Sequence, residues 1–218
     1  MFSEFLLHSQ NSTHRCAILM FMRAIGILSR SICLFLLLFV VATAASHAQT
    51  MTPAAQPPAT ILIIRHAEKL TDGQLDLSPT GFKRAGLLPN LFVPTGVRPD
   101  LPTPQVIFAT HQSKHSNRPV ETITPLAAAL HLPIDSTIVN EDYATLAAML
   151  LSGRYAGKVV LVSWHHGTLP QLVTALGAQP PNAIWSDSQF DRVWRIDYKE
   201  GKAVVKDLPQ HLLPGDSN

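Results

Sequence analysis

The stretch that decides the fold is Thr60-Ile61-Leu62-Ile63-Ile64-Arg65-His66. Four large aliphatic residues, three of them β-branched, are followed by a charged residue and an ionisable one. A short apolar run of this kind, bounded by prolines, predicts a buried strand over residues 60–64. An Arg-His pair after a strand is by itself most often a solvated strand end. However, ligands of open α/β sheets collect at the carboxyl ends of strands, where a guanidinium can bind an oxyanion and an imidazole can attack phosphorus.

Strands and helices alternate through the rest of the chain. Further strands are predicted over residues 106–109, 137–139 and 158–163. Helices are predicted over residues 79–88, 117–130, 140–150 and 167–176, with Ser78 and Asn140 as N-caps and a kink at Pro125. A terminal hairpin is expected from residues 190–198 and 202–205 around Glu200-Gly201. The alternation predicts one α/β domain, a three-layer α/β/α sandwich with a mostly parallel central sheet.

The first 48 residues have the composition of an export leader. Two arginines, Arg23 and Arg30, precede a nearly unbroken apolar stretch at residues 31–45, and Ser46-His47-Ala48 offers small residues for a signal peptidase. An uncleaved membrane anchor is the alternative, but the apolar stretch is shorter than the roughly 20 residues that a helical span needs. We expect a signal peptide over 1–48, a linker over 49–58, a domain over 59–218, no stable membrane anchor after cleavage, and a periplasmic or secreted location.

Composition excludes several classes of site. Both cysteines, Cys16 and Cys33, lie in the predicted leader, so the mature chain would have no disulfide, no thiol nucleophile and no cysteine metal site. The sequence carries 17 Lys and Arg against 15 Asp and Glu, and the leader holds three of the former and one of the latter. The mature chain is therefore near neutral, which predicts no nucleic-acid partner.

Candidate catalytic groups follow three of the predicted strands. The first strand ends at Arg65 and His66, the second leads to Arg118, and the third leads to His165 and His166. The carboxyl ends of parallel strands meet at one edge of a sheet, where a single crevice can collect these side chains. Two arginines and two histidines converging there would make a pocket for a phosphoryl group.

Four segments place these residues in a wider pattern. They are Ile63-Ile64-Arg65-His66-Ala67-Glu68-Lys69, Leu77-Ser78-Pro79-Thr80-Gly81-Phe82-Lys83-Arg84-Ala85, Ser116-Asn117-Arg118-Pro119-Val120-Glu121-Thr122 and Val162-Ser163-Trp164-His165-His166-Gly167-Thr168-Leu169-Pro170. In these segments and in their order, the chain resembles the histidine phosphatase superfamily, also called the phosphoglycerate mutase-like family. Each segment alone is a weak signal, and the four together are specific.

The resemblance implies a role for each matching residue. His66 would be the nucleophile that takes the phosphoryl group, Arg65 and Arg118 would bind its oxygens, and His165 would complete the pocket. The chemistry agrees, because a neutral imidazole is a competent nucleophile near neutral pH and phosphoryl transfer needs mainly positioning and a positive field. No metal and no other cofactor is expected.

Two assignments within the site stay open. His165 is preferred over its neighbour His166 because Thr168-Leu169-Pro170 fixes the family's frame, and adjacent residues on a strand point to opposite faces. His166 is expected to turn away at the start of the following helix. The proton donor is Glu141 or Asp142, although acids in a first helical turn also simply stabilise the helix dipole.

Other polar and aromatic residues are candidates for the rim of the pocket. His111 and His115 have the spacing of a metal pair, but no third ligand is evident, so together with Lys114 they are expected at the substrate mouth or in solvent. Three residues further along the chain, Trp185, Asp187 and Phe190, could edge the same pocket. A core cluster at an edge strand is an equally good interpretation of them.

The expected function is an exported phosphomonoesterase that acts on small-molecule phosphate esters through a phosphohistidine. A phosphomutase is the alternative among enzymes, and export argues against it because sugar-phosphate mutases act on cytoplasmic pools. A non-catalytic phospho-ligand-binding module is the alternative outside enzymes. The short loops between the motifs favour an open pocket and small or exposed substrates.

Overall fold

The computed structural model describes residues 56–71, 73–93, 98 and 100–217. The predicted signal peptide lies outside these residues, and the predicted linker is described only from residue 56 onward. Among the helices that are described, none is long and apolar enough to cross a membrane.

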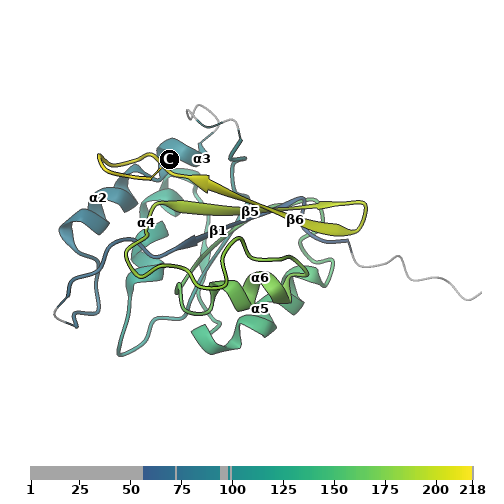
Figure 1. Cartoon of the computed structure of the whole chain (residues 1–218), viewed down its shortest axis with the longest axis horizontal. Helices are drawn as coiled ribbons and strands as arrows, with labels where there is room; N and C mark the ends of the chain where they lie inside the picture. Colours follow the sequence, from purple (N-terminus) through teal and green to yellow (C-terminus); the bar gives the residue numbers. More distant parts are fainter. Residues whose placement is uncertain (1–55, 72, 94–97, 99, 218) are drawn as a thin grey trace, which may run out of the picture. The chain divides into compact units, whose positions relative to one another are not determined.

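A six-stranded sheet forms the centre of the domain, with the strand order β3-β2-β4-β1-β5-β6. Figure 1 labels β1, β5 and β6 of this sheet. The strands are β1 (Thr60–Arg65), β2 (Val106–Ala109), β3 (Ile134–Asp135), β4 (Val159–Trp164), β5 (Arg192–Lys199) and β6 (Lys202–Pro209). The first four in chain order run parallel to one another, whereas β5 is antiparallel to both β1 and β6. The prediction of a mostly parallel sheet is confirmed.

Helices cover both faces of this sheet. They are α2 (Pro79–Leu87), α3 (Pro89–Phe92), α4 (Arg118–Leu130), α5 (Tyr143–Leu151) and α6 (Leu169–Ala175), with a 3-10 turn η1 (Asn140–Asp142) before α5. Along β1, Ile61 and Ile63 pack into a cluster with α5 and α6, while Leu62 and Ile64 pack into a second cluster with α3 and α4. Strand alternation thus builds two cores, and the predicted three-layer sandwich is confirmed.

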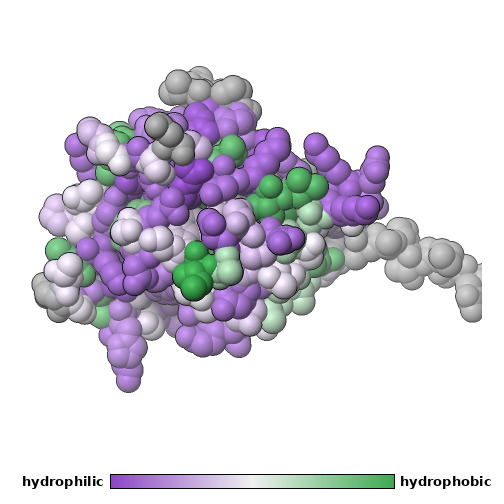
Figure 2. Space-filling view, in the orientation of Figure 1, coloured by the Kyte–Doolittle hydropathy of each residue, from purple (hydrophilic) through white to green (hydrophobic). Residues whose placement is uncertain are grey.

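Local sequence signals explain where several elements begin and turn. The Ser78 hydroxyl accepts a hydrogen bond from the Gly81 N–H at 3.1 Å, which caps α2 as predicted. Glu200 and Gly201 join β5 to β6 with φ angles of 51° and 76°, the left-handed conformation that a tight hairpin needs. On the face shown in Figure 2 hydrophilic residues dominate and hydrophobic ones form separate small groups, as expected when the large aliphatic residues fill the two cores.

Two predictions between β2 and α5 are wrong. The strand expected over residues 137–139 is absent, and the short strand β3 lies at Ile134–Asp135 instead. The Asp135 carboxylate accepts hydrogen bonds from the backbone N–H and hydroxyl of Thr137, which turns the chain and ends the strand. Asn140 does not cap α5, because its side-chain oxygen accepts a hydrogen bond from the Thr168 hydroxyl at 2.7 Å.

Candidate active site

Three neighbouring strand ends, those of β2, β4 and β1, form the edge where the candidate residues gather. Hydrogen bonding continues one residue past β1 and β2. The His66 N–H donates to the Trp164 carbonyl at 3.0 Å, and the Thr110 N–H donates to the Ser163 carbonyl at 3.2 Å. The residue after each strand is therefore held on β4, so the predicted meeting of the three strand ends is confirmed.

His66 is a buried, neutral imidazole. Its ring nitrogen Nδ1 lies 2.7 Å from the Ala67 carbonyl oxygen, which can only accept, so Nδ1 carries the proton and Nε2 keeps its lone pair. Burial lowers the pKa of His66 to about 2, and the positive charges of Arg65 and Arg118 lower it further. The residue is only 2% exposed and is thus uncharged, with its Nε2 lone pair available.

A cavity of about 350 Å³ opens next to His165, and neither His66 nor Arg65 is among the residues that line it. It is lined by Thr110, His111, Ser113, His115, Ser116, Arg118, Val139, Asn140, Glu141 and His165. The ring centroid of His165 is 5.3 Å from that of His66. Burial lowers the pKa of His165 to about 4, with Arg118 adding to the effect, so both imidazoles are neutral at physiological pH. The structure therefore brings Arg118 and His165 to His66, as expected.

Arg118 is the first residue of α4 and keeps part of its guanidinium unpaired. Its Nη1 donates to the carbonyls of Gln74 and Leu75 at 2.8 and 3.3 Å. Within the described chain its Nε is buried without a hydrogen-bond partner, and so are the hydroxyls of Thr110 and Ser116. A buried donor without a partner costs about 1–3 kcal/mol. An oxyanion in the cavity would remove that cost.

Arg65 is enclosed more tightly than Arg118. Its Nη1 donates to the carbonyls of Ser186, Asp187 and Gln189 at 2.9, 3.0 and 3.0 Å. Its guanidinium carbon lies 3.8 Å from the ring centroid of Phe190, a cation–π contact. Burial lowers the pKa of Arg65 to about 10, which leaves it charged at neutral pH.

His166 does not turn away as expected. It is absent from the lining of the cavity, but its Nδ1 lies 3.2 Å from Arg65 Nη2 and its Nε2 lies 2.5 Å from a carboxylate oxygen of Asp187. The ring centroid of His166 is 6.5 Å from that of His66, and the ring centroid of Phe190, on which Arg65 stacks, is 6.1 Å from that of His66. Both histidines after β4 therefore lie close to His66, and His166 in addition contacts Arg65.

Thr122 is a site residue that the sequence reasoning missed. Its hydroxyl oxygen accepts from the Ala67 N–H at 2.9 Å and donates to the Arg118 carbonyl at 2.7 Å. This buried side chain ties the residue after His66 to the helix that carries Arg118. Its position four residues after Arg118, one helical turn along the same face, was the available signal.

Only one of the two candidate proton donors lines the cavity. Glu141 lines it, whereas Asp142 does not. The pKa of Glu141 is lowered by a hydrogen bond from its own backbone N–H and by the Asn140 side chain. Glu141 is therefore ionised in the empty site.

Of the remaining candidates for the rim of the pocket, some lie at the site and others do not. His111 and His115 line the cavity, and Lys114 does not. No group of three or more potential ligands that could hold a metal occurs among the described residues. Asp187 and Phe190 contact the site through His166 and Arg65, but Trp185 belongs to the core, where its ring packs 4.4 Å from that of Trp194.

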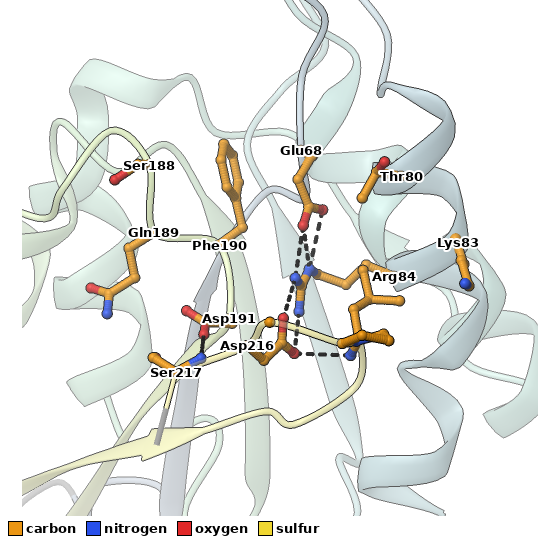
Figure 3. Close-up of a pocket in the computed structure, with 13 residues that line it drawn as sticks. Glu68, Thr80, Lys83, Arg84, Ser188, Gln189, Phe190, Asp191, Asp216 and Ser217 are labelled. Carbon is orange, nitrogen blue, oxygen red and sulfur yellow. Dashed lines mark hydrogen bonds and ion pairs between the residues drawn. The ribbon is translucent and has the colours of Figure 1, made fainter.

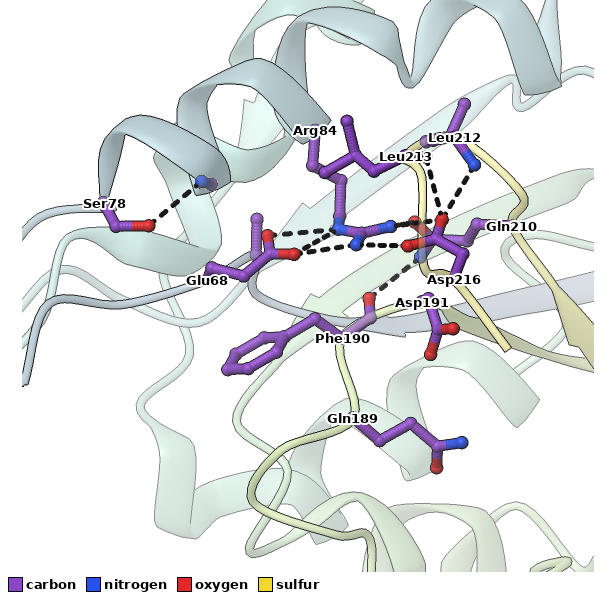
Figure 4. Close-up of polar contacts among 12 residues, drawn as sticks. Glu68, Ser78, Arg84, Gln189, Phe190, Asp191, Gln210, Leu212, Leu213 and Asp216 are labelled. Atoms are coloured by element: carbon purple, nitrogen blue, oxygen red, sulfur yellow. Dashed lines mark hydrogen bonds and ion pairs between the residues drawn. The ribbon is translucent and has the colours of Figure 1, made fainter.

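A second cavity, of about 710 Å³, lies around Arg84 (Figure 3). Here the Arg84 guanidinium is already occupied, because it donates to Glu68 at 2.7 Å and to Asp216 at 2.7 Å (Figure 4). This network joins the C-terminal segment to the loop that follows His66. We therefore assign it a supporting role and place the candidate site in the smaller cavity.

Comparison with known proteins identifies the fold. No family model and no curated protein matches the sequence. A variant of phosphoserine phosphatase from Entamoeba histolytica, solved with phosphoserine, is 11% identical over 71% of this chain and 98% of that chain, with a TM-score of 0.50.

Two further solved structures match with lower TM-scores. YhfR from Bacillus stearothermophilus is 16% identical over 73% of this chain and 98% of that one, with a TM-score of 0.49. The alpha-ribazole phosphatase from Shigella flexneri is 14% identical over 73% and 100%, with a TM-score of 0.43. The solved structures that match belong to the histidine phosphatase superfamily, and this chain has the histidine phosphatase fold.

Proposed function

We propose that the protein is a phosphomonoesterase that hydrolyses small phosphate esters through a phosphohistidine on His66. The observation that carries the proposal is the state of that residue. Its imidazole is neutral with a free Nε2, and its ring centroid is 5.3 Å from that of His165. Two arginines, Arg65 and Arg118, act on its charge and keep buried Nε atoms without a hydrogen-bond partner in the described residues.

In the first step, Nε2 of His66 attacks phosphorus and the bond from phosphorus to the leaving oxygen breaks. The two arginines and an N–H of His165 bind the phosphoryl oxygens, where charge concentrates. Nδ1 keeps its proton and its hydrogen bond to the Ala67 carbonyl, which holds the ring in place. The protein thus supplies position and a preorganised positive field.

The leaving oxygen needs a proton, and Glu141 is the one carboxyl among the residues that line the cavity. A phosphoryl dianion that enters the cavity raises the pKa of this carboxyl by like-charge repulsion, which lets it carry the proton. In the second step a water attacks the phosphohistidine, the bond from nitrogen to phosphorus breaks, and the proton of the water returns to Glu141. Inorganic phosphate leaves and Nε2 is free again.

We also propose that the enzyme works in the periplasm or outside the cell, which the composition of residues 1–48 supports. Its substrate would be a small polar ester, because Val139 is the only large apolar residue among those lining the cavity. Neighbours in fold act on phosphoserine and alpha-ribazole phosphate by their printed names, and both are small phosphomonoesters.

The test is phosphate release from a panel of phosphomonoesters by protein expressed from the full sequence. Wild type should turn over at least one member, His66→Asn should not, and His131→Asn, at the exposed end of α4, should match wild type. Transfer of phosphate to a second hydroxyl of the substrate would indicate a mutase instead. Binding of inorganic phosphate without any turnover would contradict the proposal and indicate a phospho-ligand-binding module.

A further inference from the structure

Most donors of the Arg65 guanidinium are already occupied. An arginine has five N–H groups, and here Nη1 donates to three carbonyls while Nη2 contacts His166. This leaves the N–H of Nε and one N–H of Nη2. The Nε is buried and finds no hydrogen-bond partner among the residues that the structure describes. These two donors are the ones that can meet a phosphoryl oxygen.

The direction in which the two free N–H groups of Arg65 point depends on the contacts that fix the orientation of its guanidinium. The carbonyls of Ser186, Asp187 and Gln189 all hold Nη1, so they fix one end of the group. Stacking on Phe190 limits its tilt. Rotation within the plane of the guanidinium remains, and the contact between Nη2 and His166 Nδ1 at 3.2 Å stops it.

The ring of His166 is itself oriented. Its Nδ1 must accept from Arg65, because an arginine has only donors, so the ring proton is on Nε2. That N–H donates to Asp187 Oδ1 at 2.5 Å. A ring flip would break both contacts. Asp187 also accepts from Arg65 through its carbonyl, so backbone and side chain of one residue hold both partners.

We infer that His166, oriented by Asp187, is a positioning residue that aims Arg65 at the phosphoryl group; this inference rests on the proposed function. His166 contacts Nη2 of Arg65 and acts through the arginine. Arginine is selective for phosphate because its donors form a planar fork, and a fork that is rotated in its plane loses the paired geometry. The residue next to the second catalytic histidine candidate thus affects catalysis without touching the substrate.

Two substitutions separate this role from simple packing. His166→Ala removes the acceptor for Nη2, whereas His166→Asn supplies an amide oxygen near the place of Nδ1. Loss of a hydrogen bond to a charged group corresponds to about a tenfold to hundredfold effect. We expect His166→Ala to lower kcat/KM and to weaken inhibition by inorganic phosphate by that factor, and His166→Asn to recover most of both.

The experiment measures kcat, KM and the inhibition constant of inorganic phosphate for wild type, both variants and the exposed-surface control His131→Asn. Thermal unfolding of each variant confirms that it is folded. If wild type is active but His166→Ala keeps wild-type kcat/KM and phosphate inhibition, or if His166→Asn is as impaired as His166→Ala, the positioning role is wrong while the proposed function stands. If wild type has no activity on any ester, the proposed function fails and the inference falls with it.

Discussion

Two glycines of α2 offer a matched test of how the loop after His66 is supported. A Cβ added at Gly81 would lie 2.3 Å from the carbonyl oxygen of Glu68 and 3.1 Å from its nitrogen, whereas one added at Gly86 would meet nothing within 4 Å. Ordinary contacts begin at 3.4 Å, so Gly81→Ala requires a displacement of about 1 Å between two backbones. The displaced segment follows His66 by two residues.

The magnitudes follow from the two environments. Overpacking against backbone costs about 3 kcal/mol, and the gain in helix propensity from glycine to alanine returns about 1 kcal/mol, so Gly81→Ala should lose about 2 kcal/mol of unfolding free energy. Gly86→Ala should gain about 0.5–1 kcal/mol. For a domain of this size these changes correspond to a melting temperature about 4–8 °C lower and about 1–4 °C higher.

Urea and thermal unfolding measure the stability of both variants. Phosphatase activity, measured below the unfolding transition, reports on the position of the loop after His66. Gly81→Ala should lose activity even where it is fully folded, because the movement reaches His66. Gly86→Ala should keep wild-type activity. Equal stability of the two variants, or full activity of a destabilised Gly81→Ala, would show that the contact between α2 and the loop after His66 does not support His66.

Three further predictions concern charge. Arg118→Lys should lower kcat/KM in steady-state kinetics, because lysine has no planar fork, and the expected loss of transition-state stabilisation is about 2–4 kcal/mol. Arg84→Met should cost about 3–5 kcal/mol in urea unfolding, because it leaves two carboxylates without their cation, and exposed Lys83→Met should cost less than 0.5 kcal/mol. The lowered pKa values of His66 and His165 mean that the unfolded chain binds protons below pH 6.5 before the folded one does. Stability should therefore be full above pH 6.5 and fall by about 1.4 kcal/mol per pH unit for each histidine on acidification, and His165→Asn should remove one of the two contributions.

Sequence patterns predicted the elements whose signals are local. The apolar runs of β1, β2 and β4, the cap at Ser78 and the Glu200-Gly201 turn all act over a few residues, and each appears where expected. The prediction of a strand over residues 137–139 is wrong because the Asp135 side chain accepts hydrogen bonds from Thr137 and ends the strand early. Hydrophobic patterning does not reveal a side chain that competes with the sheet for backbone hydrogen bonds.

In the candidate site, too, some contacts could be predicted from the sequence and others could not. Parallel strands bring their carboxyl ends to one edge, so the meeting of the segments that carry His66, Arg118 and the two adjacent histidines could be predicted. The choice of His165 over His166 came from the resemblance to the family. The contact between Arg65 and His166 could not, because it depends on where residues 186–190 place their carbonyls and the Asp187 carboxylate. Those positions arise from tertiary packing and have no periodic signal.

The most direct test of the account is the identity of the phosphorylated residue. Wild type mixed briefly with a labelled phosphomonoester and quenched in alkali should carry acid-labile phosphate on Nε2 of His66, as mass spectrometry of the digested protein would show. Phosphate on another residue, or rapid turnover by His66→Asn, would contradict the phosphohistidine mechanism.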